Sequence, residues 1–161
     1  MGFRKLAFRS LPNEAIPMAR VVKSVTVTND PARIIDYIAE VGNHPAFLGP
    51  LKAVSNLKGD PRKVGSSWDW TFIMAGVEFT GKAETVAYES GKRYSFRTTS
   101  GIQSTFVYSA EPGAGGSKVS IDVTYEVPKT LLAKMQTAVV EKWNEAEGAR
   151  AVENLKAILD S

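Results

Sequence analysis

The sequence predicts an α+β fold, in which a curved seven-stranded antiparallel sheet wraps around one long C-terminal helix and two short helices follow the first strand. Five segments with two-residue hydrophobic alternation follow one another between residues 65 and 127. Because only short turns separate them, neighbouring strands should pair as antiparallel hairpins. The closing stretch, residues 129–161, contains no proline and many good helix formers. A helix laid across a bent sheet leaves one natural place for a cavity, which is between the two.

The first elements follow from local signals. Residues 20–28, RVVKSVTVT, alternate with β-branched side chains and predict the first strand. Asn29 or Asp30 should cap a helix that has Pro31 at its first position, where a missing N–H costs nothing. Gly42 is expected to end this helix.

The later elements are separated by turn-forming residues. A second helical turn is expected over residues 43–48 and a short second strand over residues 51–57, followed by a polar turn. A ten-residue strand spans roughly 33 Å, a length that suits a strongly bent sheet. The five strands of the alternating region are expected at residues 66–75, 77–88, 93–99, 102–111 and 118–127.

The C-terminal helix carries more than one apolar face. After Gly148 its apolar residues lie on a different face of the helix from those of the first half. We therefore expect a bend or a change of packing partner near Gly148, with the first half over the cavity and the second half on the sheet. The alternative is a straight helix that is apolar on several sides. The stripe of the first half, at steps of three and four, is Leu132, Met135, Val139, Trp143 and Ala146.

Composition limits the possible functions. With 161 residues the chain should form one domain with a substantial core. Its net charge of +3 arises from interspersed signs and does not require a nucleic-acid partner. The absence of cysteine excludes disulfides, thiolate nucleophiles and cysteine-ligated metals, and it fits a cytoplasmic location. We expect no metal site, because a single histidine cannot build a three-histidine site. No cofactor is expected either.

The N-terminal residues predict a leader and no membrane anchor. No apolar stretch approaches the roughly 20 residues that a membrane helix needs, so stable membrane insertion is not expected. Residues 1–19 lack the apolar core of a secretory signal. They are expected to be poorly ordered, or to form a short basic amphipathic arm.

Alternation gives the sheet an unusually aromatic inner face. The rings either fill the core or line a cavity, and aromatic side chains dominate both kinds of environment. Buried indole and phenol groups need hydrogen-bond partners, which a wet cavity, a polar ligand group or backbone carbonyls would supply. The expected inward residues are Trp68, Trp70, Phe72, Met74, Val77, Phe79, Ala83, Tyr94, Phe96, Ile102, Ser104, Phe106, Tyr108, Ala110, Val119, Ile121, Val123, Tyr125 and Val127.

Several segments resemble a known superfamily. They are VTVTNDPARIIDYIAEVGNHPAFLGPL, GSSWDWTFIMAGVEFTGKAETV, TFVYSAEPGAGGSKVSIDVTYEVP and the final turns ENLKAIL. With these segments the chain resembles the START-like, helix-grip superfamily (SRPBCC), and within it the polyketide cyclase/dehydrase and lipid-transport-like group. The resemblance covers about residues 20–159 and implies a START-like ligand-binding domain over residues 20–161.

The resemblance implies a deep apolar cavity between the sheet and the long helix. The superfamily has no shared catalytic constellation, so only cavity positions carry over to this chain. These implied ligand-binding residues are Trp70, Phe72, Phe79, Tyr94, Phe106, Tyr108, Tyr125, Met135, Val139 and Trp143.

Candidate catalytic residues are few. His44, the only histidine, is either a general base near the cavity mouth or an exposed loop residue beside a helix break. Tyr94 and Tyr108 are the other candidates. The glycines of PGAGGS lie between two strands and predict a hairpin loop, not a phosphate site.

Other charged residues are expected to lie outside the cavity. Asp69, Arg93 and Arg97 should lie on the outer face of the sheet, although a one-residue shift of register would turn Arg97 inward to bind a carboxylate. The carboxylates that could meet as a pair are Asp36, Glu40 and Glu147.

Two functions remain open from the sequence. The first is binding of a hydrophobic small molecule, such as a lipid, isoprenoid or polyketide, for transport, storage or sensing. The second is a polyketide cyclase or dehydratase that folds a reactive chain and excludes water. We expect a monomer or homodimer with a small-molecule ligand and no nucleic-acid partner.

Overall fold

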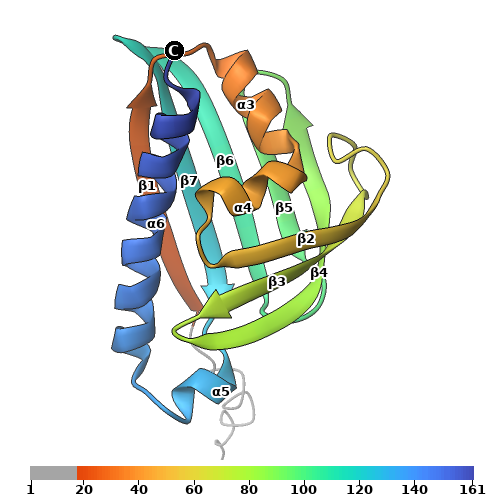
Figure 1. Ribbon diagram of the computed structural model, residues 1–161, viewed down its shortest axis with the longest axis vertical. Coiled ribbons are helices and arrows are strands. Elements are labelled where there is room, and N and C mark those ends of the chain that lie inside the picture. Colours follow the sequence, from red (N-terminus) through yellow and green to blue (C-terminus); the bar gives the residue numbers. More distant parts are fainter. Residues whose placement is uncertain (1–17) are drawn as a thin grey trace, which may run out of the picture.

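The computed structural model of the protein describes residues 18–161. The expected leader therefore lies outside the described residues, except that Met18 and Ala19 belong to the first strand. Seven strands within residues 18–161 form one antiparallel sheet in the order β1-β7-β6-β5-β4-β3-β2 (Figure 1). The strands are β1 (Met18–Val27), β2 (Leu51–Lys58), β3 (Ser67–Met74), β4 (Val77–Glu89), β5 (Arg93–Thr98), β6 (Ser104–Gly113) and β7 (Gly116–Glu126). This confirms the predicted fold class.

The sheet pairs its first strand in sequence with its last. Strands β2 to β7 pair with their neighbours in sequence, as hairpin reasoning predicts. Strand β1 instead pairs with β7, from Met18 opposite Glu126 to Val27 opposite Ser117. A β-bulge between Thr85 and Ala87 interrupts the ladder of β4 with β5, and such bulges bend a strand and increase its twist. The open edges of the sheet are therefore β1 and β2.

Two short helices lie over one end of the sheet. Helix α3 (Pro31–Ala39) begins at Asp30, whose side chain accepts a hydrogen bond from the Arg33 backbone N–H. The 3-10 turn η2 (Val41–Asn43) and helix α4 (His44–Phe47) follow. Asn154 of the long helix donates its side-chain amide to the Phe47 carbonyl oxygen at 3.2 Å, which ties α4 to that helix.

The C-terminal helix differs from the expectation at its start and in its inward stripe, whereas its uninterrupted course through Gly148 matches the alternative of a straight helix. It is interrupted early, between α5 (Lys129–Leu132) and α6 (Thr137–Leu159), and it continues without a break through Gly148 (Figure 1). Its inward stripe is also different, since Val139 is 52% exposed and Ala146 is exposed too. The stripe that faces the sheet is Val140, Asn144, Gly148, Ala151 and Leu155.

Gly148 has a packing role in the structure. A Cβ atom at this position would lie 2.6 Å from Cγ1 of Val21 on β1, so the absence of a side chain lets α6 approach the edge strand closely. The sequence predicts a bend or a change of packing partner near this glycine; in the structure the helix continues without a break, and the glycine is a point of close packing. Close approach of one backbone to another element is a common reason for glycine inside a helix or strand.

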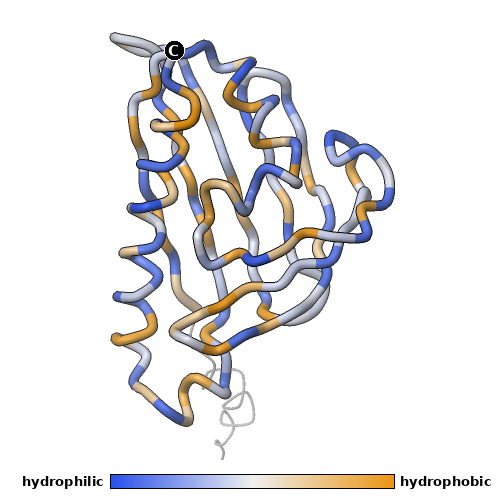
Figure 2. The backbone as a smooth tube through the Cα atoms, viewed as in Figure 1, coloured by the Kyte–Doolittle hydropathy of each residue, from blue (hydrophilic) through white to orange (hydrophobic). Residues whose placement is uncertain are grey.

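The inner face of the sheet follows the predicted alternation. On β7, Val119, Ile121, Tyr125 and the following Val127 are buried, and Val123 packs against the same core. On β6, Ser104, Tyr108 and Ala110 are buried. Figure 2 shows hydrophobic and hydrophilic positions mixed along the strands and along α6. No helix in the described part of the chain is long and apolar enough to cross a membrane.

Candidate functional site

A cavity lies between the curved sheet, α6 and the turn that follows α4. Its volume is about 100 Å³. The lining residues, which come from most elements of the fold, are Val21, Leu48, Pro50, Leu51, Trp68, Trp70, Phe72, Met74, Phe96, Thr98, Ile102, Ser104, Phe106, Ile121, Val123, Tyr125, Asn144, Glu147 and Gly148.

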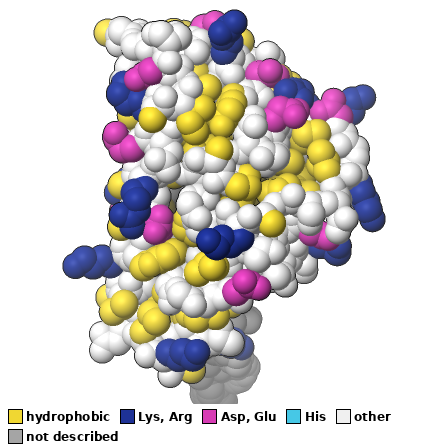
Figure 3. Space-filling model, viewed as in Figure 1, with side chains coloured by type: hydrophobic (Ala, Val, Ile, Leu, Met, Phe, Trp, Pro, Cys, Tyr) yellow, Lys and Arg dark blue, Asp and Glu magenta, His cyan; other side chains and the backbone are white. Residues whose placement is uncertain are grey.

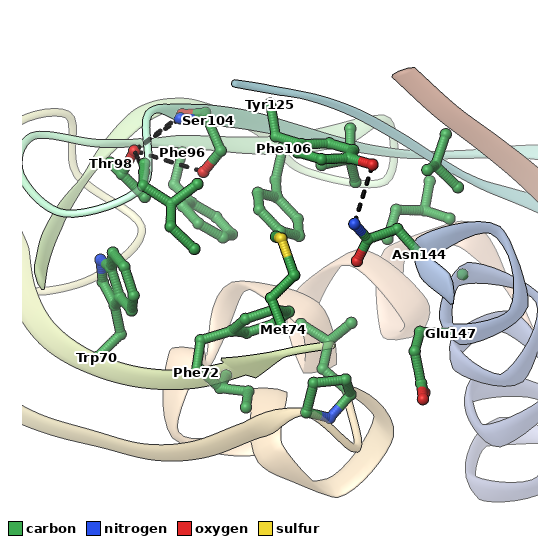
Figure 4. Close-up of a pocket in the computed structure, with 18 of the residues that line it drawn as sticks. Trp70, Phe72, Met74, Phe96, Thr98, Ser104, Phe106, Tyr125, Asn144 and Glu147 are labelled. Carbon is green, nitrogen blue, oxygen red and sulfur yellow. Dashed lines mark hydrogen bonds between the residues drawn. The ribbon is translucent and has the colours of Figure 1, made fainter. Parts of the chain in front are cut away.

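Aromatic rings form the sheet side of this cavity. Phe96 on β5 and Phe106 on β6 are cross-strand partners whose rings stack at a centroid distance of 4.7 Å. Figure 4 shows Trp70 at one end of the hollow and Asn144 and Glu147 of α6 at the other, with Phe72 and Met74 between them. The cavity therefore offers mostly apolar surface, with polar groups in a few places.

Two glycines make room for the Trp70 ring. A Cβ atom at Gly81 on β4 would lie 2.5 Å from Cζ2 of Trp70, and one at Gly101 would lie 2.7 Å from the same ring. Gly101 also has a φ of +83°, a conformation that favours glycine. The indole nitrogen of Trp70 is buried and has no hydrogen-bond partner among the described residues.

The predicted ligand-binding residues divide into two groups. Trp70, Phe72, Phe106 and Tyr125 line the cavity. The others lie elsewhere: Tyr94 and Tyr108 are buried behind the cavity wall, Val139 is largely exposed, and Phe79, Met135 and Trp143 are partly buried against the core outside the lining. A binding role for any of the ten stays a prediction.

Two polar residues of the wall, Thr98 and Asn144, are not among the residues that the sequence predicts to face inward. Thr98 continues the inward alternation of Tyr94 and Phe96, so the alternation of β5 extended by one step would have found it. Asn144 is 9% exposed and lies on the inward stripe of α6. Hydropathy alone cannot identify Asn144, because a pattern of hydropathy assigns every polar side chain to the solvent-facing side of a helix.

The polar residues at the α6 side are hydrogen-bonded to each other. The Asn144 side-chain amide nitrogen donates to the Tyr125 hydroxyl at 2.9 Å (Figure 4). Burial raises the pKa of Tyr125, and the bond from Asn144 opposes this rise only in part. The phenol is therefore protonated at neutral pH and can donate its own hydrogen bond.

His44 is neither an exposed loop residue nor a group at the cavity wall, so both expectations for its position are wrong. It is 1% exposed, and its Nε2 donates to the Ile38 carbonyl oxygen at 2.7 Å. Its ring packs among Phe47, Tyr94, Phe96 and Tyr108 at centroid distances of 5.4 to 6.3 Å. Burial lowers the pKa of His44 to about 4, so the imidazole is neutral at pH 7.

The two tyrosine candidates lie beside His44. The Tyr94 hydroxyl hydrogen-bonds to Thr85 Oγ1 at 2.9 Å, and burial raises the pKa of Tyr94 to about 12. The Tyr108 hydroxyl is buried without a partner among the described residues, and burial raises its pKa further. The structure thus brings the three catalytic candidates together, but the stacked Phe96 and Phe106 rings lie between this cluster and the cavity.

The remaining charged residues are mostly at the surface. Arg97 pairs with Glu84, and Arg93 pairs with Glu89, on the outer face as expected. Asp69 accepts hydrogen bonds from Asn56 and Lys82, and the first of these contributes most to lowering its pKa. Figure 3 shows acidic and basic side chains scattered over the viewed face instead of gathered in one patch.

The three carboxylates do not form one site. Asp36 and Glu40 on α3 and the following turn both bind the Arg62 guanidinium, at 2.7 and 2.6 Å. Glu147 lies apart from them at the cavity, where it pairs with Arg150 at 3.1 Å. The PGAGGS glycines form the β6–β7 turn, as the sequence predicts.

The bent sheet, the long clasping helix and the cavity between them define a helix-grip protein of the START-like kind. The family described as polyketide cyclase / dehydrase and lipid transport matches residues 18–160, and the chain belongs to this family. No curated protein matches the chain.

Solved structures share the fold at low sequence identity. TTHA0849 from Thermus thermophilus has a TM-score of 0.72 and 14% identity, covering 89% of this chain and 97% of its own. The Zhui aromatase/cyclase from Streptomyces sp. R1128 has a TM-score of 0.65 and 12% identity, with coverages of 89% and 94%. Major latex-like protein 151 from Panax ginseng has a TM-score of 0.63 and 14% identity, with coverages of 88% and 97%. At these identities the likeness concerns the fold alone.

Proposed function

We propose that this protein binds a hydrophobic small molecule, such as a lipid, isoprenoid or polyketide, for transport, storage or sensing. The observation that carries the proposal is the cavity between the sheet and α6, whose wall is built almost entirely from apolar and aromatic side chains. Pockets of this character are the usual sites of small-molecule binding in proteins. Membership in a family of cyclases and lipid-transport proteins supports the same proposal.

The binding test uses a neutral fluorescent probe, N-phenyl-1-naphthylamine, with the full chain. We expect its emission to rise with a stoichiometry of one probe per chain. Val123→Phe places a ring in the space that the probe would occupy. Because adding volume to a packed interior is costly, we expect probe binding to weaken by at least about tenfold. Val22→Phe is the matched control, because Val22 is 51% exposed on the neighbouring β1.

Native mass spectrometry of the protein from its source complements the probe. An apolar molecule that travels with the chain and is chemically unchanged would support a carrier or sensor. If the probe does not bind to the unmodified protein, or binds equally to the Val123→Phe protein, the cavity is not a binding site.

A second candidate function is that of a polyketide cyclase or dehydratase. Glu147 favours it, because this carboxylate is the charged group among the described residues of the cavity wall and a general base must reach the substrate. The test is turnover of a polyketide substrate by the Glu147→Gln protein, which should keep binding and lose the reaction. His44→Gln and Tyr108→Phe should matter less for turnover, since both groups lie behind the Phe96 and Phe106 rings.

A further inference from the structure

Apart from the indole groups of Trp68 and Trp70, the polar side chains of the cavity wall fall into two groups. In the first, the Thr98 hydroxyl donates to the Ile102 carbonyl oxygen at 2.6 Å and accepts from the Ser104 backbone N–H at 2.8 Å. These bonds use the Thr98 hydroxyl within the protein. The second group, Tyr125, Asn144 and Glu147, lies at the α6 side of the cavity (Figure 4).

The pair of Tyr125 and Asn144 has hydrogen-bonding capacity left for a ligand. The Asn144 amide nitrogen donates to the Tyr125 hydroxyl, so this hydroxyl keeps its own proton to donate. The Asn144 side-chain oxygen lies toward the hollow, and no described residue donates a hydrogen bond to it (Figure 4). One free donor and one free acceptor side by side match a hydroxyl group, which both donates and accepts.

The charge of the wall argues against an acidic ligand. Among the described residues that line the cavity none is lysine, arginine or histidine, and Glu147 supplies the one negative charge. A ligand carboxylate would lose its water and meet no cation in exchange, which is costly for any buried charge. Arg150, the partner of Glu147, has a side chain 64% exposed and lies outside the lining.

The shape of the sheet side favours flat molecules. The stacked Phe96 and Phe106 rings, with Phe72 and Trp70 around them, present ring faces and edges to the hollow. Aromatic pairs in offset or edge-to-face geometry gain stability beyond the burial of their surface. A flat ring system would therefore gain more from this wall than a flexible chain of the same area.

We infer that the ligand is a neutral ring-bearing molecule whose hydroxyl group binds between Tyr125 and Asn144. This inference rests on the proposed function, since it concerns the same cavity. The rings lie over the Phe72 and Phe106 side, and the hydroxyl faces α6. Glu147 disfavours carboxylates, so free fatty acids are poor ligands.

The test compares three molecules with one skeleton, 2-naphthol, 2-methylnaphthalene and 2-naphthoate, by displacement of N-phenyl-1-naphthylamine at pH 7. A hydrogen bond of ordinary strength predicts that 2-naphthol binds about three- to tenfold more tightly than 2-methylnaphthalene. We expect 2-naphthoate to be the weakest of the three.

Variants assign this preference to the named residues. Asn144→Leu and Tyr125→Phe should each reduce the ratio of 2-naphthol to 2-methylnaphthalene affinity toward one, with folding checked by thermal unfolding. Glu147→Gln should improve 2-naphthoate binding relative to 2-naphthol, whereas Glu153→Gln, at an exposed position of α6, should not.

The outcomes separate this inference from the proposed function. Equal affinity for the three molecules, or a preference that survives both Asn144→Leu and Tyr125→Phe, overturns the inference and leaves apolar binding standing. If neither the probe nor any of the three molecules binds, both the inference and the proposed function fail.

Discussion

His44 shows how burial decides what a titratable side chain can do. Among the described residues, the one side-chain hydrogen bond of His44 joins Nε2 to the Ile38 carbonyl oxygen, and four aromatic rings pack around the imidazole. In this setting the charged imidazolium is disfavoured, so the pKa falls to about 4. As a neutral donor the residue therefore ties α4 to α3, and its ring packs against Tyr94, Phe96 and Tyr108 of the sheet. It is poorly suited to proton transfer at neutral pH.

This pKa makes stability depend on pH with a defined sign. The unfolded chain protonates His44 near its ordinary pKa of about 6.5, whereas the folded protein does so only near 4. The unfolded state thus binds more protons between these values, and stability is full above about pH 6.5 and falls as the pH drops toward 4. Across this pH range, the protonation of His44 lowers the free energy of unfolding by about 3 kcal/mol.

His44→Gln tests this residue-scale prediction, because glutamine can also donate to the Ile38 carbonyl but does not titrate. Urea unfolding at pH 7 and at pH 4.5 should show a smaller loss of stability in the variant than in the unmodified protein. Equal losses in the two proteins would mean that His44 is accessible to protons in the folded state.

At the scale of elements, Arg62 connects the β2–β3 loop to α3. Its guanidinium donates from Nε and Nη2 to Asp36, at 3.0 and 2.7 Å, and from Nη1 to Glu40 at 2.6 Å. The hydrogen bonds to Glu40 and Asp36 raise the pKa of Arg62, which stays charged at any pH at which the protein is folded. Three charge-assisted hydrogen bonds from one guanidinium to two carboxylates are stronger than a single surface ion pair.

Arg62→Gln should therefore lower the free energy of unfolding by about 1 kcal/mol in low salt. The matched control is Arg93→Gln, which removes one pair between side chains that are each about half exposed and should cost under about 0.5 kcal/mol. Urea unfolding at about 0.05 M and about 1 M NaCl measures both, and the Arg62 effect should shrink in high salt. If the two variants behave alike, the loop is not held by this contact.

Helix α6 shows which part of an element can be derived from sequence. Its existence and its C-terminal position follow from composition, but its orientation does not. Two members of the inward stripe, Asn144 and Gly148, carry no hydropathy signal, because one fills a polar place in the cavity wall and the other permits contact with Val21. The expected stripe through Val139 is therefore wrong, because in the structure the helix is rotated about its axis so that Val140 and Asn144 face the sheet instead.

At the scale of the whole molecule, local signals were sufficient for most of the architecture. The order of strands and the inward residues of β3, β6 and β7 follow from alternation and short turns, which depend on neighbours in sequence. Pairing of β1 with β7 and the packing of α6 on β1 depend on residues about a hundred positions apart. The same limit applies to the cavity, whose polar pair of Tyr125 and Asn144 forms only when β7 and α6 meet.

A cavity that binds a ligand couples binding to the stability of the entire fold. A ligand that binds only the folded state stabilises it by about 2.7 kcal/mol when its free concentration is 100 times its Kd. For a chain of this size, each kcal/mol raises Tm by roughly 2–4 °C, so near-saturating 2-naphthol should raise Tm by about 5–10 °C.

Calorimetry at several ligand concentrations measures this shift in Tm. It should be largely absent in Val123→Phe and present in Val22→Phe, because only the first substitution fills the hollow. An unchanged Tm in the unmodified protein, at concentrations where the fluorescent probe is displaced, would show that the ligand binds the unfolded chain equally well and that the cavity is not its site.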